Sequence, residues 1–139
     1  MKLSVKSDYA MRAVLALSRH YPGSAAQRID RLASQYGISP NYLVQILIEL
    51  KAKGITRSVR GKDGGYLLAR APSEISLGDV LRAVHGEVFD APALGDANCP
   101  AELRRAWRKL KISLESTADS VTFQQLLDEG AEKEKMYYI

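Results

Sequence analysis

The chain contains a single cysteine, Cys99, in its 139 residues. One cysteine cannot form a disulfide within the chain, which excludes a disulfide-stapled secreted domain and suits the reducing cytoplasm. The two histidines, His20 and His85, lie far apart in the sequence, and the chain has no phosphate-binding loop and no Cys-x-x-Cys pair. The commonest enzyme chemistries therefore lack their residues, so we expect no catalytic residues and a protein that is not an enzyme.

Long apolar runs are also missing. No segment approaches the roughly 18 apolar residues of a membrane-spanning helix, and the first eight residues lack the apolar centre of a signal peptide. Hydrophobic residues still make up 46% of the chain, which is enough for a folded core. We therefore expect a cytoplasmic globular protein without a membrane partner, built as one domain or as a small domain with a helical extension.

Positive charge is concentrated in the first half of the chain. Residues 1–70 carry 12 Lys and Arg against 4 Asp and Glu, a net charge of +8, whereas residues 71–139 carry 8 against 12, a net charge of −4. This asymmetry predicts a first half that binds a polyanion and a second half with another task. Chance differences between halves can produce similar numbers, so the charge needs support from the pattern of elements.

Helical spacing of apolar residues predicts two helices in the first 37 residues. The first lies within residues 4–20 and stops before Pro22-Gly23. Its apolar face consists of Ala10, Ala13, Val14 and Leu17. The second helix is shorter, from about Ile29 to Tyr36, and ends at Gly37.

A third helix follows after a turn of only two residues, 37–38. Ser39 is a good N-cap, Pro40 suits the first helical position, and Ile38 with Leu43 can form a hydrophobic staple. The helix runs until Gly54. Two helices joined by such a short glycine-containing turn are typical of a helix-turn-helix.

The third helix leaves polar residues off its apolar face, namely Asn41, Tyr42, Gln45 and Lys51. Amides and hydroxyls near the start of such a helix can read base edges, and cations can bind phosphates. A solvated polar face is present on any amphipathic helix, however. This helix by itself favours that simpler interpretation.

The stretch "VRGKDGGYLLAR" follows directly, from Val59 to Arg70. Two short strands, 55–59 and 66–69, flank a tip that holds two cations and three glycines: Arg60, Gly61, Lys62, Gly64 and Gly65. An ordinary surface hairpin is one interpretation. Three helices followed by a hairpin, however, is the order of a winged helix-turn-helix, in which glycines allow close approach and the cations face the groove. Together with the basic first half, this order favours DNA binding.

The stretches "SDYAMRAVLAL", "GISPNYLVQIL", "VRGKDGGYLLAR" and "ISLGDVLRAVHG" resemble the bacterial winged helix-turn-helix transcriptional regulators typified by IscR, NsrR and CymR. The resemblance covers residues 1–86 closely and 100–128 more loosely, and its wing motif Arg-Gly-x-x-Gly-Gly-Tyr spans Arg60 to Tyr66. It implies a mainly α fold with a small β-hairpin wing and a dimeric DNA-binding transcription factor. The residues expected at the DNA are Lys2, Lys6, Ser39, Asn41, Tyr42, Gln45, Arg60, Lys62, Gly64 and Tyr66.

The second half of the chain is predicted to contain three further helices. Ser76 begins one with Asp79 in a capping box, and this helix ends near Gly86. Residues 86–99 have no periodicity and are expected to form a loop. Thr122 and Gln125 form a second capping box that opens a final short helix.

Between these lies a helix beginning at Pro100 that carries an a/d seam, made of Leu103, Trp107, Leu110 and Leu114. Packing of this seam against the chain's own core is one interpretation. The resemblance implies the other, dimerisation through this helix. The expected organisation is then a winged helix-turn-helix DNA-binding domain at 1–86, a sensor-type loop at 87–99, and a dimerisation helix with a short C-terminal helix at 100–139.

The loop is where members of this family carry cysteine ligands for an iron–sulfur cluster. A 2Fe–2S centre usually needs four cysteines, or two cysteines and two histidines, and this chain offers Cys99 alone. Asp8 lies where the NsrR branch provides an aspartate ligand, although a cap or a salt bridge in the first helix is the simpler role. We therefore expect no metal site, and the single cysteine disfavours an iron–sulfur cluster without excluding one.

Cys99 itself has two interpretations. It lies just before a helix start, where the helix dipole favours a thiolate and hence a sensor role, while Asp96 and Glu102 oppose this effect. A lone cysteine is more often a small apolar filler.

Together these patterns predict a cytoplasmic homodimer that binds double-stranded DNA at a palindromic operator, most simply as a repressor. The alternatives are a winged-helix protein-interaction module that binds no DNA, and an iron–sulfur or thiol redox-sensing regulator. A modulating protein or small effector remains open as a further partner.

Overall fold

A computed structural model describes residues 3–23 and 25–137, with side chains up to residue 134. Lys2 lies outside the described residues. The helices and strands are, in chain order, α1 (Val5–Ser18), α2 (Ile29–Tyr36), α3 (Pro40–Ala52), β1 (Thr56–Val59), β2 (Gly65–Leu68), α4 (Leu77–His85), α5 (Ala101–Ser120) and α6 (Phe123–Tyr137). Short 3-10 turns occur at Pro72–Glu74 and Pro92–Gly95. The predicted fold class, mainly α with a small β-hairpin wing, is confirmed.

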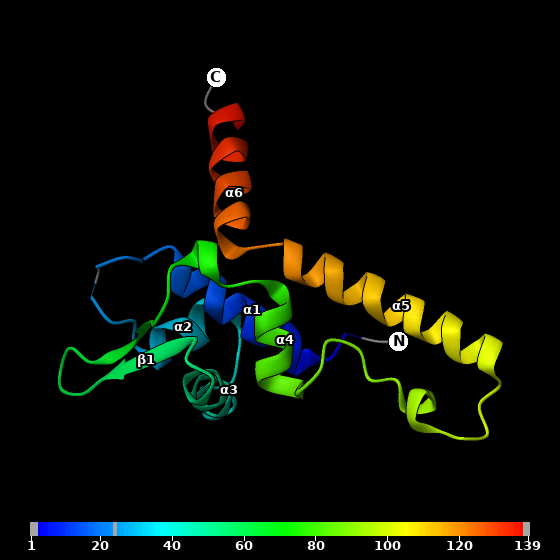
Figure 1. Ribbon diagram of the computed structural model, residues 1–139. Helices are drawn as coiled ribbons and strands as arrows, with labels where there is room; N and C mark the ends of the chain where they lie inside the picture. Colours follow the sequence, from blue (N-terminus) through cyan, green and yellow to red (C-terminus); the bar gives the residue numbers. More distant parts are fainter. Residues whose placement is uncertain (1–2, 24, 138–139) are drawn as a thin grey trace.

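The first four helices and the hairpin gather into one body, while α5 runs out from it to one side and α6 stands away from it at a steep angle (Figure 1). The core of the body lies between α1 and α3. The apolar face predicted for the first helix is at most 1% exposed, at Ala10, Ala13, Val14 and Leu17. The facing residues of α3 are completely buried: Leu43, Ile46, Leu47 and Leu50.

The helix-turn-helix geometry comes from the short turn between α2 and α3. Gly37 caps α2 in the left-handed conformation, with φ of +67°, which a side chain rarely tolerates. Ile38, 5% exposed, and Leu43, completely buried, both join the core, as the predicted hydrophobic staple requires. Ser39 takes the N-cap position, but its side chain makes no capping hydrogen bond.

The hairpin is held to the body by backbone pairing of β2. β1 and β2 pair antiparallel with Thr56 opposite Leu68 and Val59 opposite Gly65. Gln27, from the segment before α2, adds a bridge to Tyr66 through two backbone hydrogen bonds of 2.8 Å. β2 is therefore paired at Tyr66 on both of its edges, which restricts the direction of the wing.

The helices α4, α5 and α6 meet at one junction. Both bonds of the predicted Ser76–Asp79 capping box form, at 3.0 and 3.1 Å. The second predicted box also forms, with Thr122 N–H donating to Gln125 at 3.3 Å and Gln125 N–H donating to Thr122 at 3.2 Å. Backbone bonds between residues 75–77 and 121–123 then join the start of α4 to the start of α6.

The final helix is longer than predicted: α6 has 15 residues, and the expectation of a short helix was wrong. Its beginning is anchored, since Phe123 is fully buried in the core and Leu126 packs against the same core. Residues 128–134 are exposed, so they carry no apolar periodicity that could reveal a helix. Their Glu, Lys and Ala content sustains the helix through intrinsic propensity.

A paired arginine fixes the base of α5 against α4. Arg82 makes two parallel hydrogen bonds to the carboxylate of Asp119, at 2.7 and 2.8 Å. The helices approach closely there, because a Cβ on Gly78 would collide with the Asp119 carboxylate. The hydrogen bond from Arg82 lowers the pKa of Asp119 below its usual value of 3.8, and the same bond raises the pKa of Arg82.

Replacing Asp119 by Asn tests this pair. Since the pKa of Asp119 is lowered in the folded state, the pair stabilises the fold above pH 3.8, and that contribution is lost as the pH falls through the lowered pKa. We expect Asp119→Asn to lower the melting temperature by about 1–3 °C near neutral pH. The difference should vanish near pH ~2, as thermal unfolding followed by circular dichroism can measure.

Asp128→Asn is the matched control, because Asp128 is exposed on α6 and accepts a single hydrogen bond from Gln124. This variant should melt like the wild type at both pH values. An Asp119→Asn protein with an unchanged melting temperature near neutral pH would contradict a stabilising role for the pair.

Candidate nucleic-acid interface

The polar face predicted for DNA contact lies on the outer side of α3. Its four residues at the start of the helix are all exposed: Ser39, Asn41, Tyr42 and Gln45. The opposite side of the helix is buried in the core, so burial fixes the direction in which these side chains point. The hydroxyl of Ser39, which makes no capping hydrogen bond to the helix, is exposed beside these residues.

Tyr42 is supported by side chains of α1. Its ring packs edge-on against Tyr9, with ring centroids 5.9 Å apart and an interplanar angle of 77°. Arg12 lies over the Tyr9 ring at 5.7 Å and pairs with Asp8 at 2.8 Å. The salt bridge that the sequence offered as the simpler role for Asp8 is therefore present, and this group of contacts restrains the first turn of α3.

Lys6 is engaged within the fold. Its Nζ lies 2.8 Å from a carboxylate oxygen of Glu49, which joins α1 to α3. A phosphate contact by Lys6 would have to compete with this ion pair, so its place in the DNA interface stays a prediction. Lys2, the other cation predicted there, lies outside the described residues.

Ile48 lies on the outward face of α3 and was not predicted as part of the interface. It is 48% exposed although it is a large apolar side chain. It follows Gln45 by three residues and Asn41 by seven, which places all three on one side of the helix. The sequence contained this spacing, but an apolar residue is usually assigned to the core face.

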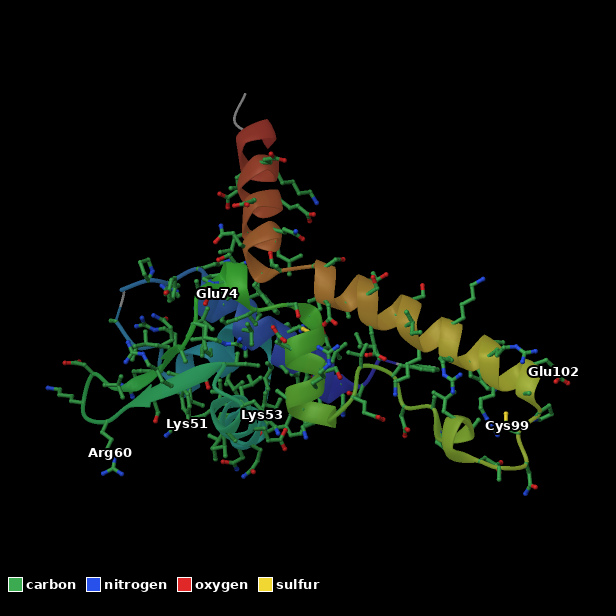
Figure 2. All side chains as sticks on the ribbon, viewed as in Figure 1. Lys51, Lys53, Arg60, Glu74, Cys99 and Glu102 are labelled. Carbon is green, nitrogen blue, oxygen red and sulfur yellow. The ribbon has the colours of Figure 1, made fainter. Side chains whose placement is uncertain are left out.

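Cations extend this surface toward the wing. Lys51 Nζ donates to the Ser58 hydroxyl at 2.7 Å, which joins the end of α3 to β1. Arg60 and Lys62 are exposed at the tip. Figure 2 shows the Arg60 side chain pointing away from the body at the end of the hairpin, with Lys51 and Lys53 on the same side of the molecule.

The glycines of the wing are required by backbone packing. A Cβ on Gly64 would collide with the carbonyl oxygen of Val59 across the turn. A Cβ on Gly65 would collide with the carbonyl of Gln27, and Gly65 also has φ of +153°. Tyr66 follows, half-buried against the core. Gly64 and Tyr66 therefore shape and anchor the wing, and direct DNA contact by them stays a prediction.

The a/d seam of α5 is largely open to solvent. Leu103, Trp107 and Leu110 are 44, 37 and 42% exposed, while Leu114 is half-buried near the body. Packing of the whole seam against the chain's own core, one of the two sequence interpretations, is therefore absent in the part of the chain that the structure describes. An exposed apolar stripe with a central tryptophan is typical of a surface that meets another protein.

Cys99 lies at the opposite end of the molecule from the wing tip, beside Glu102 at the start of α5 (Figure 2). It is partly exposed, and its thiol lies 3.7 Å from the Pro100 carbonyl oxygen. Arg104 donates to the Cys99 carbonyl at 3.2 Å. These contacts hold the backbone of the loop and give the thiol no acidic or basic partner of its own in residues 3–23 and 25–134.

The residues of the chain do not fit an iron–sulfur cluster. A cluster needs several thiolate, imidazole or carboxylate ligands close together, and the described residues contain no group of three such side chains that could hold a metal ion. Two side chains that could be considered beside Cys99 are engaged elsewhere: Asp8 pairs with Arg12, and His85 bonds the hydroxyls of Ser4 and Ser7.

Among the described residues, no helix is both long enough and apolar enough to cross a membrane.

Comparison with known proteins agrees with this geometry. The model of the Rrf2 family, described as an iron-dependent transcriptional regulator, matches residues 3–129. IscR of Vibrio atlanticus, an HTH-type transcriptional regulator, is 33% identical over 134 residues, which cover 94% of this chain and 77% of that protein. The structure of T. potens IscR superposes with a TM-score of 0.80 at 32% identity, covering 99% of this chain and 97% of that one. CymR of B. subtilis shares the fold, with a TM-score of 0.80 at 24% identity over 93% of this chain and 98% of that one.

The exposed face of α3, the adjoining wing and these relatives define a winged helix-turn-helix transcriptional regulator that binds DNA. The chain belongs to the Rrf2 family. The iron named in the family's description has no matching set of ligands within the described residues of one chain.

Proposed function

We propose that the protein is a homodimeric repressor of the cytoplasm that binds a palindromic operator with α3 and the wing of each protomer. The observation that carries the proposal is the outward face of α3, where Asn41 and Gln45 are exposed on the side opposite a completely buried apolar face. Family membership supports DNA binding over the protein-interaction module that the sequence left open.

In this proposal α3 enters the major groove. The amides of Asn41 and Gln45 can each make paired hydrogen bonds to an adenine edge, worth about 1–3 kcal/mol of discrimination. Ser39 and Tyr42 add hydroxyls at the same end of the helix, where base contacts usually occur. Ile48 adds an apolar side chain, which suits the methyl group of thymine.

The wing supplies charge beside this groove. Arg60 and Lys62 extend from a tip that is fixed at its base by the pairing with Gln27. A narrow minor groove concentrates negative potential. Two cations on a loop of fixed direction would therefore increase the affinity of the protein for DNA there without reading many bases. We keep the division of the chain that the sequence predicted. Residues 1–86 would bind DNA, residues 87–99 would form a sensor-type loop, and residues 100–139 would dimerise.

The seam of α5 would join two protomers. A helix of 20 residues is roughly 30 Å long, so two such helices can bury a continuous apolar stripe. A twofold-symmetric pair presents two copies of α3, and a palindrome is the DNA sequence that matches this symmetry. Binding over a promoter would then block transcription, which is the simplest form of regulation.

Arg60→Ala tests the wing. The operator is first obtained by capturing sheared genomic fragments with the protein and sequencing them. We expect Arg60→Ala to weaken operator binding about 5–100-fold and to reduce the slope of log affinity against log salt by about one, because one phosphate-region contact is lost. Arg105→Ala, an exposed position on α5, is the matched control and should bind like the wild type. Full affinity in Arg60→Ala would show that the hairpin does not contact DNA.

Ile48→Ala tests readout of a thymine methyl. Operators in which each thymine is replaced in turn by deoxyuridine remove one methyl at a time. At one position per half-site, replacing thymine by deoxyuridine should weaken binding of the wild type about fourfold, the contribution of one buried methyl group. The same replacement should leave the affinity of Ile48→Ala unchanged. If no thymine shows this coupling, Ile48 does not read a base.

Trp107→Ala tests the seam. Loss of a large aromatic side chain from each half of the interface should raise the dimer dissociation constant at least about 100-fold, since such truncations cost about 3–5 kcal/mol when buried. Sedimentation velocity measures the change, and circular dichroism confirms that the variant is folded. Ile112→Ala, 60% exposed on the opposite side of α5, is the control and should stay dimeric. A stable dimer of Trp107→Ala would place the interface elsewhere.

A further inference from the structure

A groove of about 700 Å³ lies where the start of α1, one side of α4, residues 87–90 and the base of α5 meet. This volume is within the range of roughly 300–1,000 Å³ that is typical of sites for small molecules. The groove is separate from α3 and from the wing, whose residues do not line it.

Most of the groove wall is apolar. Side chains of three helices and of the segment after α4 contribute to it, including Met11, Leu77, Leu81, Val88, Phe89 and Leu114. Burying an apolar group against such a wall contributes about 25 cal/mol per Å² removed from water. The wall therefore favours a ligand whose surface is mainly hydrocarbon.

A polar cluster forms one end. His85 Nε2 lies 2.7 Å from the Ser4 hydroxyl and 2.5 Å from the Ser7 hydroxyl, and the two hydroxyls are 2.9 Å apart. All three residues line the groove, with Ser7 buried, Ser4 half-buried and His85 exposed. Hydroxyl and imidazole groups can each donate or accept, so they can bond a single polar group on a ligand.

The charges along the groove have one sign. Two carboxylates line it, Glu87 and Asp90, and no Lys or Arg of the described residues does. Glu87 has a partner in Lys111 at 3.5 Å, whereas Asp90 forms no ion pair within the described part of the chain. An anionic ligand would be repelled here, and a cation of suitable size would be attracted.

We propose that this groove binds a small molecule that is mainly apolar and carries one amino group, with its hydrocarbon part between α4 and α5 and its ammonium near Asp90. This rests on the proposed function, a DNA-binding regulator, for which such a molecule would be an effector. Its position suits that role, because one bound molecule would touch α1 and α4 of the DNA-binding part as well as α5 of the proposed dimerisation part.

The test compares two probes that share an apolar chain and differ in charge, n-octylamine and octanoate. Each is titrated against the dimeric full-length protein carrying N-phenyl-1-naphthylamine, a neutral fluorophore that brightens in apolar sites. We expect octylamine to displace the fluorophore at about tenfold lower concentration than octanoate does, from one charge interaction near a partly exposed site. Equal displacement by the two probes would overturn the proposal.

Three variants assign the binding to the groove. Val88→Trp, which fills it, should abolish fluorophore binding, and Asp90→Asn should remove the preference for the amine. Asp128→Asn on α6 is the matched control and should keep it. Binding that survives Val88→Trp, or a preference that survives Asp90→Asn, would place the probe elsewhere and overturn the proposal.

The other occupant of such a groove is a second copy of the chain, since Leu114 belongs both to the groove and to the α5 seam. Fluorophore binding to a monomeric Trp107→Ala variant but not to the wild-type dimer would mean that the partner fills the groove, which also overturns the proposal. These measurements contain no DNA, so their failure is distinct from a failure of operator binding, which is measured separately.

Discussion

The packing of α3 against α1 is the constraint on which the rest of the molecule depends. Four completely buried side chains of α3, each worth roughly 1.5–3 kcal/mol by removal from water, leave the helix one orientation. The face that carries Asn41, Gln45 and Ile48 then has to point outward. The same helix also sets the wing, because the buried Thr56 hydroxyl donates to the Leu47 carbonyl at 3.3 Å and Lys51 donates to Ser58. One core therefore positions both α3 and the wing.

The second part of the molecule is organised by polar contacts. Capping boxes begin both α4 and α6, and the double hydrogen bond between Arg82 and Asp119 fixes where α5 leaves the body. The apolar seam of α5 is exposed from Leu103 as far as Leu110 in the described part of the chain. A helix of this kind is stable in isolation only through its own backbone bonds, so a covering partner would contribute directly to its stability.

The sequence predicted the elements that have local signals and missed those that depend on distant contacts. Apolar spacing and the cap residues placed α1 to α4 to within two residues and the hairpin strands to within one, because Gly37 and Pro40 act through their own backbone geometry. The length of α6 was missed, since its exposed end has no periodicity. The Lys6–Glu49 pair and the Gln27–Tyr66 bridge join residues far apart in the chain, and no local pattern encodes them. Of the candidate interface, the polar residues were predictable, while Ile48 required knowledge of which apolar side chains the core leaves uncovered.

α5 contacts the body near one end, at the close approach of Gly78 to Asp119, and the helix extends from there over 20 residues, roughly 30 Å. A rotation of α5 by about 10° around this contact would move the start of the helix by about 5 Å. Small displacements at the junction are thereby converted into large ones at the distant end, where Cys99 and the start of α5 lie (Figure 2). The same contact would transmit a force in the other direction. A partner that moved the start of α5 would displace α4 and, through α4, the body that carries α3.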